Sequence, residues 1–263
     1  MTAPVIVPLV PVLSSVLSAY DRKGQTGRPR SELQVLGARR DGVLIQPAAD
    51  ALAALHRAVE AEGGDLRVSD CHRSHAVQAA ARAKYDAWVA AGKPRPGSAG
   101  FDGARMKAAF VALPGRSNHN GGRAVDLDLA RLALPGVDPG RQLDRLWALA
   151  MPLGWSPVIR APDERASEAW HFDFYGDLAG VFRRRGYEQG ALAAALLVGH
   201  GPTLPDMRAA VAQALLQRAG FDCGAIDGQA GDRTRRAWSA AMGSALDLSE
   251  PGLRALYGLP AAM

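Results

Sequence analysis

The stretch SNHNGGRAVDLD, residues 117–128, places a histidine and an aspartate seven positions apart, with two glycines between them. From residue 124 to residue 130, apolar side chains alternate with polar ones, the period-two pattern of a β-strand with a buried apolar face and a carboxylate face. The glycine pair at 121–122 permits a tight turn before this strand. A loop histidine and a strand aspartate could therefore converge on one metal ion, with His119 and Asp126 as its ligands.

A second stretch, WHFDFYG at residues 170–176, alternates in the same way and carries His171 on its polar face. Catalytic zinc sites use three protein ligands, with histidine nitrogens and carboxylate oxygens among them, and keep one position for water. His171 could supply the third ligand. Glu168 stands three residues earlier and could take a proton from water without being a ligand. Each residue alone could have an ordinary structural role, so the spacing leaves both interpretations open.

The remaining pattern predicts an α+β fold, because strands are separated by helices of uneven spacing. No glycine-rich phosphate loop opens a helix, which argues against a regular βαβ repeat. The segment from Lys93 to Gly103 holds two prolines and three glycines, and we expect a loop there that could line a cleft. Apolar periodicity predicts helices over residues 47–63, 74–93, 141–153, 177–185 and 188–197, and further strands over 65–70 and 155–160.

Composition narrows the class of protein. The net charge of +5 suits an anionic partner, but the longest basic run is Arg183–Arg185, so we do not expect nucleic-acid binding. No uninterrupted apolar run is long enough to span a membrane. Cys71 and Cys223 lie far apart, which excludes a disulfide framework and a cysteine zinc cluster. The first 24 residues include an apolar stretch broken by prolines, for which an extended arm is a better interpretation than a cleaved signal peptide.

The two metal motifs together resemble those of the zinc D-alanyl-D-alanine carboxypeptidases and dipeptidases of the VanY and VanX kind, the M15 metallopeptidases. The resemblance covers residues 40–178 and implies the fold shared with the hedgehog signalling domain: a small antiparallel sheet with flanking helices. It implies zinc bound by His119, Asp126 and His171, with Glu168 as the catalytic base. The matches are Ser117, His119, Gly122, Ala124 and Asp126 for Ser-x-His-x-x-Gly-x-Ala-x-Asp, and Glu168, Trp170 and His171 for Glu-x-Trp-His.

The family also carries an arginine after the strand that follows the first helix, and SDCHRSHAVQ stands at that place. Arg73 would be a two-pronged donor to a substrate carboxylate or to the carbonyl oxygen that gains charge on attack. Cys71 and His72 depart from the family pattern, which puts the shape of the substrate pocket in doubt. His72 and His75 could in principle bind metal, but we interpret them as residues of the pocket rim.

Further residues are predicted to support this site. Asp128, on the carboxylate face of the strand, could orient a metal ligand, although it could equally be solvated. The expected substrate-binding residues are Ser117, Ser74, Gln78 and Trp170, from the motifs and their surroundings.

The character of the sequence changes near residue 200. We expect a peptidase domain at 1–198, a linker at 199–206 and a small all-α domain at 207–263, near the lower size limit for independent folding. The last domain resembles the peptidoglycan-binding domains of cell-wall hydrolases, although a generic helical appendage would also fit. The matching loop positions are Gly220, Phe221, Gly224, Asp227, Gly228, Gly231 and Thr234.

Both resemblances imply a zinc-dependent peptidoglycan peptidase, anchored to its polymer and monomeric. The bond cut would be D-Ala-D-Ala (carboxypeptidase) or L-Ala-D-Glu (endopeptidase, as in phage endolysins), and the motifs do not separate these. The alternative is a non-catalytic wall-binding protein with structural zinc, against which Glu168 argues; a cytoplasmic dipeptidase is disfavoured by the second domain. We expect a place in the cell envelope, or a phage lysin that reaches the wall through a holin.

Overall fold

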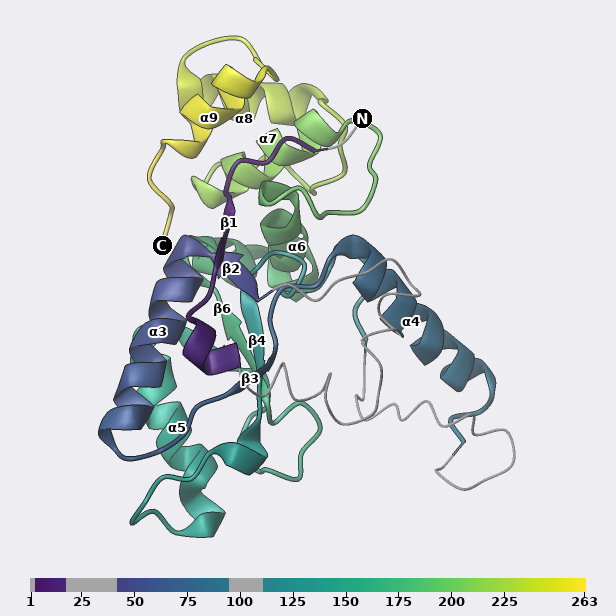
Figure 1. Cartoon of the computed structure of the whole chain (residues 1–263). Coiled ribbons are helices and arrows are strands. Elements are labelled where there is room, and N and C mark those ends of the chain that lie inside the picture. Colours follow the sequence, from purple (N-terminus) through teal and green to yellow (C-terminus); the bar gives the residue numbers. More distant parts are fainter. Residues whose placement is uncertain (1–2, 18–41, 95–110) are drawn as a thin grey trace.

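The computed structural model describes residues 3–17, 42–94 and 111–263, and this part of the chain has the predicted α+β fold (Figure 1). Its centre is an antiparallel sheet of four short strands in the order β3-β4-β6-β5. Most of the predicted loop at Lys93–Gly103 lies outside the described residues. The strands are β3 (Val68–Asp70), β4 (Ala124–Leu127), β5 (Trp155–Pro157) and β6 (His171–Phe174).

The register of this sheet aligns three of its polar residues. Asp126 on β4 lies opposite Asp70 on β3 and opposite His171 on β6. All residues of these three strands are buried, including those of the polar face. The predicted carboxylate face is therefore not solvated along the strands but enclosed by other parts of the domain, where paired charges are required.

The helices around the sheet follow the predicted periodicity. α3 (Gln46–Ala61) buries side chains three and four positions apart and packs beside α5 (Gln142–Ala150). α4 (His75–Ala90) buries two side chains, Val77 and Gln78, and its C-terminal part projects from the domain in Figure 1. α5 continues into a short 3₁₀ turn that ends at Gly154, a left-handed residue. α4 therefore contributes to the site through its first turn.

The N-terminal arm packs on the domain, as expected for an extended segment. Its strand β1 (Leu9–Pro11) pairs antiparallel with β2 (Val43–Ile45), which leads directly into α3. The backbone N–H groups of Ile6 and Val7 donate to the carbonyl oxygen of Leu197, the last residue of α6 (Ala179–Leu197). The sequence did not predict this strand pair.

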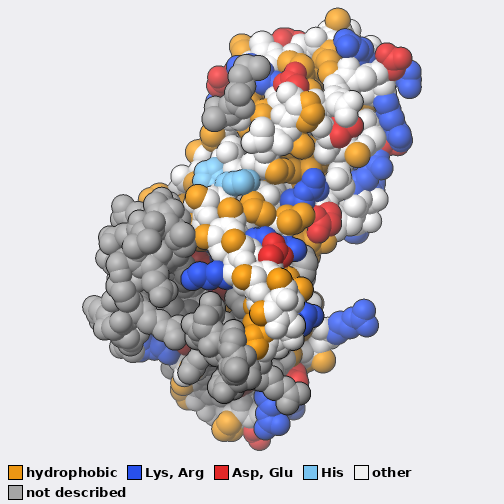
Figure 2. Space-filling view, turned by 90° about the vertical axis from the view of Figure 1, so that its right-hand side faces the viewer, with side chains coloured by type: hydrophobic (Ala, Val, Ile, Leu, Met, Phe, Trp, Pro, Cys, Tyr) orange, Lys and Arg blue, Asp and Glu red, His pale blue; other side chains and the backbone are white. Residues whose placement is uncertain are grey.

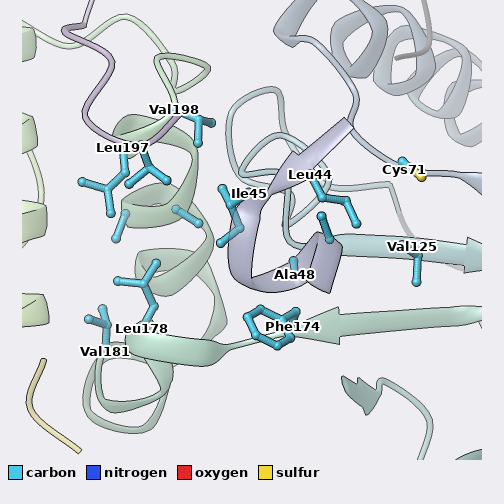
Figure 3. Packing of buried hydrophobic residues seen from close by; sticks show 14 of the residues in the cluster. Leu44, Ile45, Ala48, Cys71, Val125, Phe174, Leu178, Val181, Leu197 and Val198 are labelled. Atoms are coloured by element: carbon cyan, nitrogen blue, oxygen red, sulfur yellow. The ribbon is translucent and has the colours of Figure 1, made fainter. Parts of the chain in front are cut away.

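The two short helices predicted after the sheet are both present, and they meet at a bend at Gly186 within the segment labelled α6 (Ala179–Leu197). Figure 3 shows Val181 and Leu197 of this element in one cluster of buried side chains with Ile45 and Phe174. α6 thus covers the end of the sheet, and it also contacts α7 (Met207–Arg218). The same hydrophobic core continues from the sheet into the C-terminal helices.

The C-terminal helices α7, α8 (Asp232–Met242) and α9 (Glu250–Tyr257) confirm the predicted secondary structure and lie together at one end of the molecule (Figure 1). Gln213 organises their glycine-rich loop, because its side-chain oxygen accepts from the N–H groups of Asp227 and Gly228. The segment expected to be a linker is packed: a Cβ on Gly115 would lie 2.4 Å from the nitrogen of Pro202.

An ion network with two buried arginines joins these helices to the part of the chain that contains the sheet. Asp177, which follows β6, accepts hydrogen bonds of 2.6 Å from both Arg123, which precedes β4, and Arg218 on α7. Both arginines are almost fully buried. The C-terminal helices are therefore docked on the sheet by paired buried charges as well as by apolar packing.

The distribution of surface charge and the state of the two cysteines agree with the predictions made from the composition. On the face drawn in Figure 2, basic and acidic side chains are interspersed, and neither sign forms a continuous field. Cys71 and Cys223 are both free and buried. Within the described ranges, no helix is both long and apolar enough to cross a membrane.

Candidate active site

The loop before β4 folds on itself through its own backbone. The carbonyl oxygen of Asn118 accepts from the N–H groups of Gly121 and Arg123, so the chain turns tightly between the motif histidine and the strand. Gly122 has φ 63°, and a Cβ there would lie 2.4 Å from a methyl group of Leu9. Glycine is therefore required at this position for both conformation and space.

Three ligand atoms meet where this loop and the two central strands converge. Nε2 of His119 lies 3.3 Å from Oδ1 of Asp126 and 3.2 Å from Nδ1 of His171, and the last two atoms are 3.0 Å apart. Tetrahedral zinc with bonds of about 2.0–2.1 Å would separate its ligand atoms by roughly 3.3 Å. The three residues are buried and form the one possible metal-binding group found in the described part of the chain. Their geometry fits the predicted ion.

The other nitrogen of each imidazole has a fixed acceptor. Nδ1 of His119 donates to the carbonyl oxygen of Cys71, and Nε2 of His171 donates to Oδ1 of Asp173 at 3.0 Å. Because those nitrogens carry the protons, the facing nitrogens present lone pairs toward the centre of the group. Asp173 thus holds one ligand in the orientation that a metal requires.

Arg73 holds the third ligand. Its Nη2 donates to Oδ2 of Asp126 at 2.9 Å, and its Nε donates to Oδ2 of Asp70, also at 2.9 Å. Asp126 therefore turns Oδ1 toward the two histidines while Oδ2 is occupied. Among the described residues, Nη1 of Arg73 has one long contact, 3.5 Å, with Gln78. This end of the guanidinium remains available to a ligand in the adjoining cleft.

The protonation equilibria of this cluster reflect its burial and its charges. Burial opposes ionisation of Asp126, but His119, His171 and Arg73 outweigh it and hold the pKa of its carboxyl well below the usual range. Burial likewise opposes the charge on His171, but Asp173 and Asp126 raise its pKa to about 10. The pKa of His119 is lowered by burial and by Arg73. In the metal-free chain, one proton is therefore held at His171, at the place where a cation would bind.

Glu168 lies in the turn before β6, with φ 70°. Left-handed backbone is uncommon for residues other than glycine and is found disproportionately at functional sites. The carbonyl oxygen of Glu168 accepts from the N–H of His171, which fixes the turn against the metal ligand. Burial raises the pKa of the Glu168 carboxyl above its ordinary value, partly offset by His171. A raised pKa suits a group that must accept and return a proton.

The metal-binding group opens into a cleft of about 930 Å³. The cleft brings together most residues that the sequence predicted for the site. Its walls include Arg73, Gln78, Ser117, His119, Asp126, Asp128, Glu168, Trp170 and His171.

For three residues, the structure shows contacts that differ from the predicted role. Ser74 is the N-cap of α4, where its Oγ accepts from the N–H of Val77, and it does not line the cleft. Asp128 lines the cleft, but the carboxylate that bonds to a ligand histidine is Asp173. The interpretation of His72 as a rim residue is wrong: it is 1% exposed and its Nε2 lies 2.7 Å from Nδ1 of His200. Burial next to a second imidazole lowers the pKa of His72 to about 3.

Comparison with models of known protein families shows to which family the chain belongs. Residues 42–177 match the family model described as VanY: D-alanyl-D-alanine carboxypeptidase. The chain belongs to the VanY family. No individually curated protein is significantly similar to it.

The VanY match ends before α6, so α6 and the C-terminal helices lie outside it. Membership of this family makes the chain a peptidase of the D-Ala-D-Ala carboxypeptidase type, with peptidoglycan as a plausible substrate. All three residues of the possible metal-binding group lie within the matched range.

Sequence reasoning missed Asp70 and the structural role of Asp173 in this VanY domain. Both carboxylates were visible as strand residues, and Asp70 stands three positions before Arg73. The role of Asp70 depends on the register that aligns it with Asp126 and His171 across three strands, whereas Asp173 bonds to His171 two positions earlier on the same strand. Spacing within one strand did not reveal that alignment.

Proposed function

We propose that the protein is a zinc-dependent D,D-carboxypeptidase that removes the terminal D-alanine from peptidoglycan stem peptides. The observation that carries the proposal is the triangle of ligand atoms from His119, Asp126 and His171, open to a cleft whose wall includes Glu168. The family supports the reaction type. Zinc dependence and the bond cut are the parts that experiment must establish.

Bound by these three residues, zinc would supply Lewis acidity that polarises the scissile carbonyl and lowers the pKa of water. The carboxylate of Glu168 accepts the proton that the attacking water loses, and then delivers it to the nitrogen of the departing D-alanine. His119 and His171 remain neutral ligands because their outer nitrogens donate to Cys71 and Asp173. The chain thus separates metal binding from proton transfer.

Arg73 has two roles in this proposal. Its Nη2 and Nε fix Asp126 and Asp70, while the Nη1 edge faces the cleft and can donate to the substrate carboxylate or to the developing oxyanion. Burial opposes its charge, but the two carboxylates raise its pKa further, so it remains a cation. A buried permanent cation beside the metal site would favour a substrate that ends in a carboxylate.

The C-terminal helices would serve as the wall-binding unit, which follows from the resemblance of the loop at residues 220–234. Anchoring to an insoluble polymer raises the local concentration of substrate. We place the enzyme in the cell envelope, with delivery through a holin as the alternative route. Co-sedimentation of the full chain with sacculi tests this role. A chelator in the sample removes the metal, so that any binding that remains does not depend on the metal site.

The decisive experiment compares the wild type with Glu168→Gln on purified pentapeptide muropeptides, with mass spectrometry of the products and metal analysis of both proteins. We expect release of one alanine by the zinc-loaded wild type and none by the chelated protein. Glu168→Gln is expected to retain zinc and lose turnover. Loss of zinc in this variant would contradict its assignment as the base.

An L-Ala-D-Glu endopeptidase remains the second candidate, because the same metal ligands would serve either bond. Release of a whole stem peptide without its L-alanine would establish that activity in place of the carboxypeptidase. Binding to sacculi with neither product would favour a structural metal site.

A further inference from the structure

The bend in α6 is built into the backbone at Gly186. This residue has φ 76° and ψ 174°, a region that is essentially restricted to glycine. A Cβ at this position would meet no atom within 4 Å, so neighbouring side chains do not require a glycine there. The backbone conformation does. Conformations of this kind cost free energy and are concentrated at functional sites.

The residue after the bend is Tyr187, which lines the same cleft as the metal-binding group. It exposes 39% of its surface, and its ring meets Phe182 edge-on with centroids 6.1 Å apart. Phe182 also contacts Tyr175, at 4.3 Å, and Tyr175 lines the cleft as well. Without the bend, a continuous helix would turn the residue at 187 in another direction.

The hydroxyl of Tyr187 reaches the loop that carries the first metal ligand. It lies close to the backbone of Asn118, the residue before His119. Burial raises the pKa of the Tyr187 hydroxyl well above its ordinary value, although the residue keeps 39% of its surface exposed. The hydroxyl is therefore a neutral hydrogen-bond donor at every pH at which the enzyme would act.

The two ends of the substrate differ in charge, and so do the donors around the cleft. Arg73 is a cation suited to the terminal carboxylate, whereas a neutral phenol is suited to a neutral carbonyl oxygen. We propose that Tyr187 is a substrate-positioning residue whose hydroxyl donates a hydrogen bond to a peptide carbonyl oxygen of the bound stem peptide. The role rests on the proposed function, because it requires a peptide in the cleft. Tyr187 lies outside the residues that match the family.

Kinetics of Tyr187→Phe test this role. A single neutral hydrogen bond made in both ground and transition states should raise KM about 3- to 10-fold and leave kcat within roughly 2-fold. Tyr257→Phe is the matched control, since Tyr257 lies beside Arg218 and does not line the cleft. Its KM should equal that of the wild type. A wild-type KM in Tyr187→Phe would overturn the proposal.

A binding measurement separates this role from the proposed function. In the Glu168→Gln background, fluorescence of Trp170, which lines the cleft, reports binding of an acetylated tripeptide that ends in D-Ala-D-Ala. Adding Tyr187→Phe should weaken binding by the same factor as KM, with metal content unchanged. Unchanged binding would overturn the role of Tyr187 alone. No turnover of stem peptides by the wild type would overturn the proposed function, and this role with it.

Gly186→Ala provides an independent variant. It should raise KM at least as much as Tyr187→Phe, because alanine cannot adopt the bend without strain. A folded Gly186→Ala protein with the KM of the wild type would overturn the inference that the bend positions Tyr187.

Discussion

The strongest test of how the molecule is assembled is removal of the carboxylate of Asp177. It accepts 2.6 Å hydrogen bonds from Arg123 and Arg218, whose side chains are 3% and 11% exposed. Asp177→Ala leaves two buried cations that face each other without the anion between them. Breaking a buried ion pair on one side costs about 3–5 kcal/mol. Since the Asp177 side chain is itself 29% exposed and both arginines keep backbone carbonyl acceptors, we expect a loss at the lower end of this range, about 3 kcal/mol.

Urea denaturation followed by far-ultraviolet circular dichroism measures this loss. Arg233→Ala is the control, because its carboxylate partner is fully exposed and such pairs add little to stability. Burial opposes ionisation of Asp177, but the two arginines outweigh it and lower its pKa. Its contribution should therefore be complete above the unfolded-state pKa and disappear as the pH falls through the folded-state value.

Two results would refute the reasoning about Asp177. One is a loss no larger than that of the exposed control. The other is a difference between wild type and Asp177→Ala that does not shrink on acidification, which would mean that the network is not held by an ionised carboxylate. Separate unfolding of the C-terminal helices in the variant alone would instead support it, by showing that the network couples the two parts.

Three further predictions concern the site. The affinity for zinc should increase as pH rises from 6 to 9, and binding should release about one proton, because the raised pKa of His171, about 10, makes a proton compete with zinc for this ligand. Competition with a chromogenic chelator measures the affinity, and a pH-independent affinity would contradict the prediction. At saturating zinc, kcat/KM should fall on acidification as the Glu168 carboxylate becomes protonated, and the residual activity of Glu168→Gln should lack this acid limb. An identical acid limb in the variant would exclude Glu168 as the base. Gly122→Ala should lower the free energy of unfolding by about 1–3 kcal/mol and reduce the metal content of the protein, because alanine is strained at a φ of 63°. A variant with the unfolding free energy of the wild type would show that this conformation is not essential.

The helices could be predicted because each carries its own signal. α3 has apolar residues at helical spacing and a glycine after its end, and its limits agree with the prediction within two residues. The pair of β1 and β2 could not be predicted, since strands of three residues are too short for a periodic pattern and their partners are distant in sequence. The bend in α6 could be predicted, because Gly186 falls in the gap between the two helices expected over residues 177–185 and 188–197.

The metal ligands could be predicted from the sequence, whereas the residues that support them could not. His119 and Asp126 share one motif, and its turn and strand bring them together locally. Asp70 and Asp173 act on atoms of other residues: one bonds to Arg73, the other to the ring of His171. Both contacts join residues that are close in the sequence, but they serve the site only because β3, β4 and β6 are neighbours, and strand order is a property of the whole sheet that no single segment specifies.

The charges of the assembled cluster explain why a divalent cation suits it. The carboxylates of Asp70, Asp126 and Asp173 are buried in one cluster, where the guanidinium of Arg73 pairs with the first two and the ring of His171 with the third. With neutral imidazoles, the group carries two uncompensated negative charges, which is costly in a buried site. The metal-free chain reduces that excess by binding a proton at His171, whereas Zn²⁺ would neutralise it completely. Removal of Arg73 would therefore unbalance the metal site as well as the substrate site, because one network serves both.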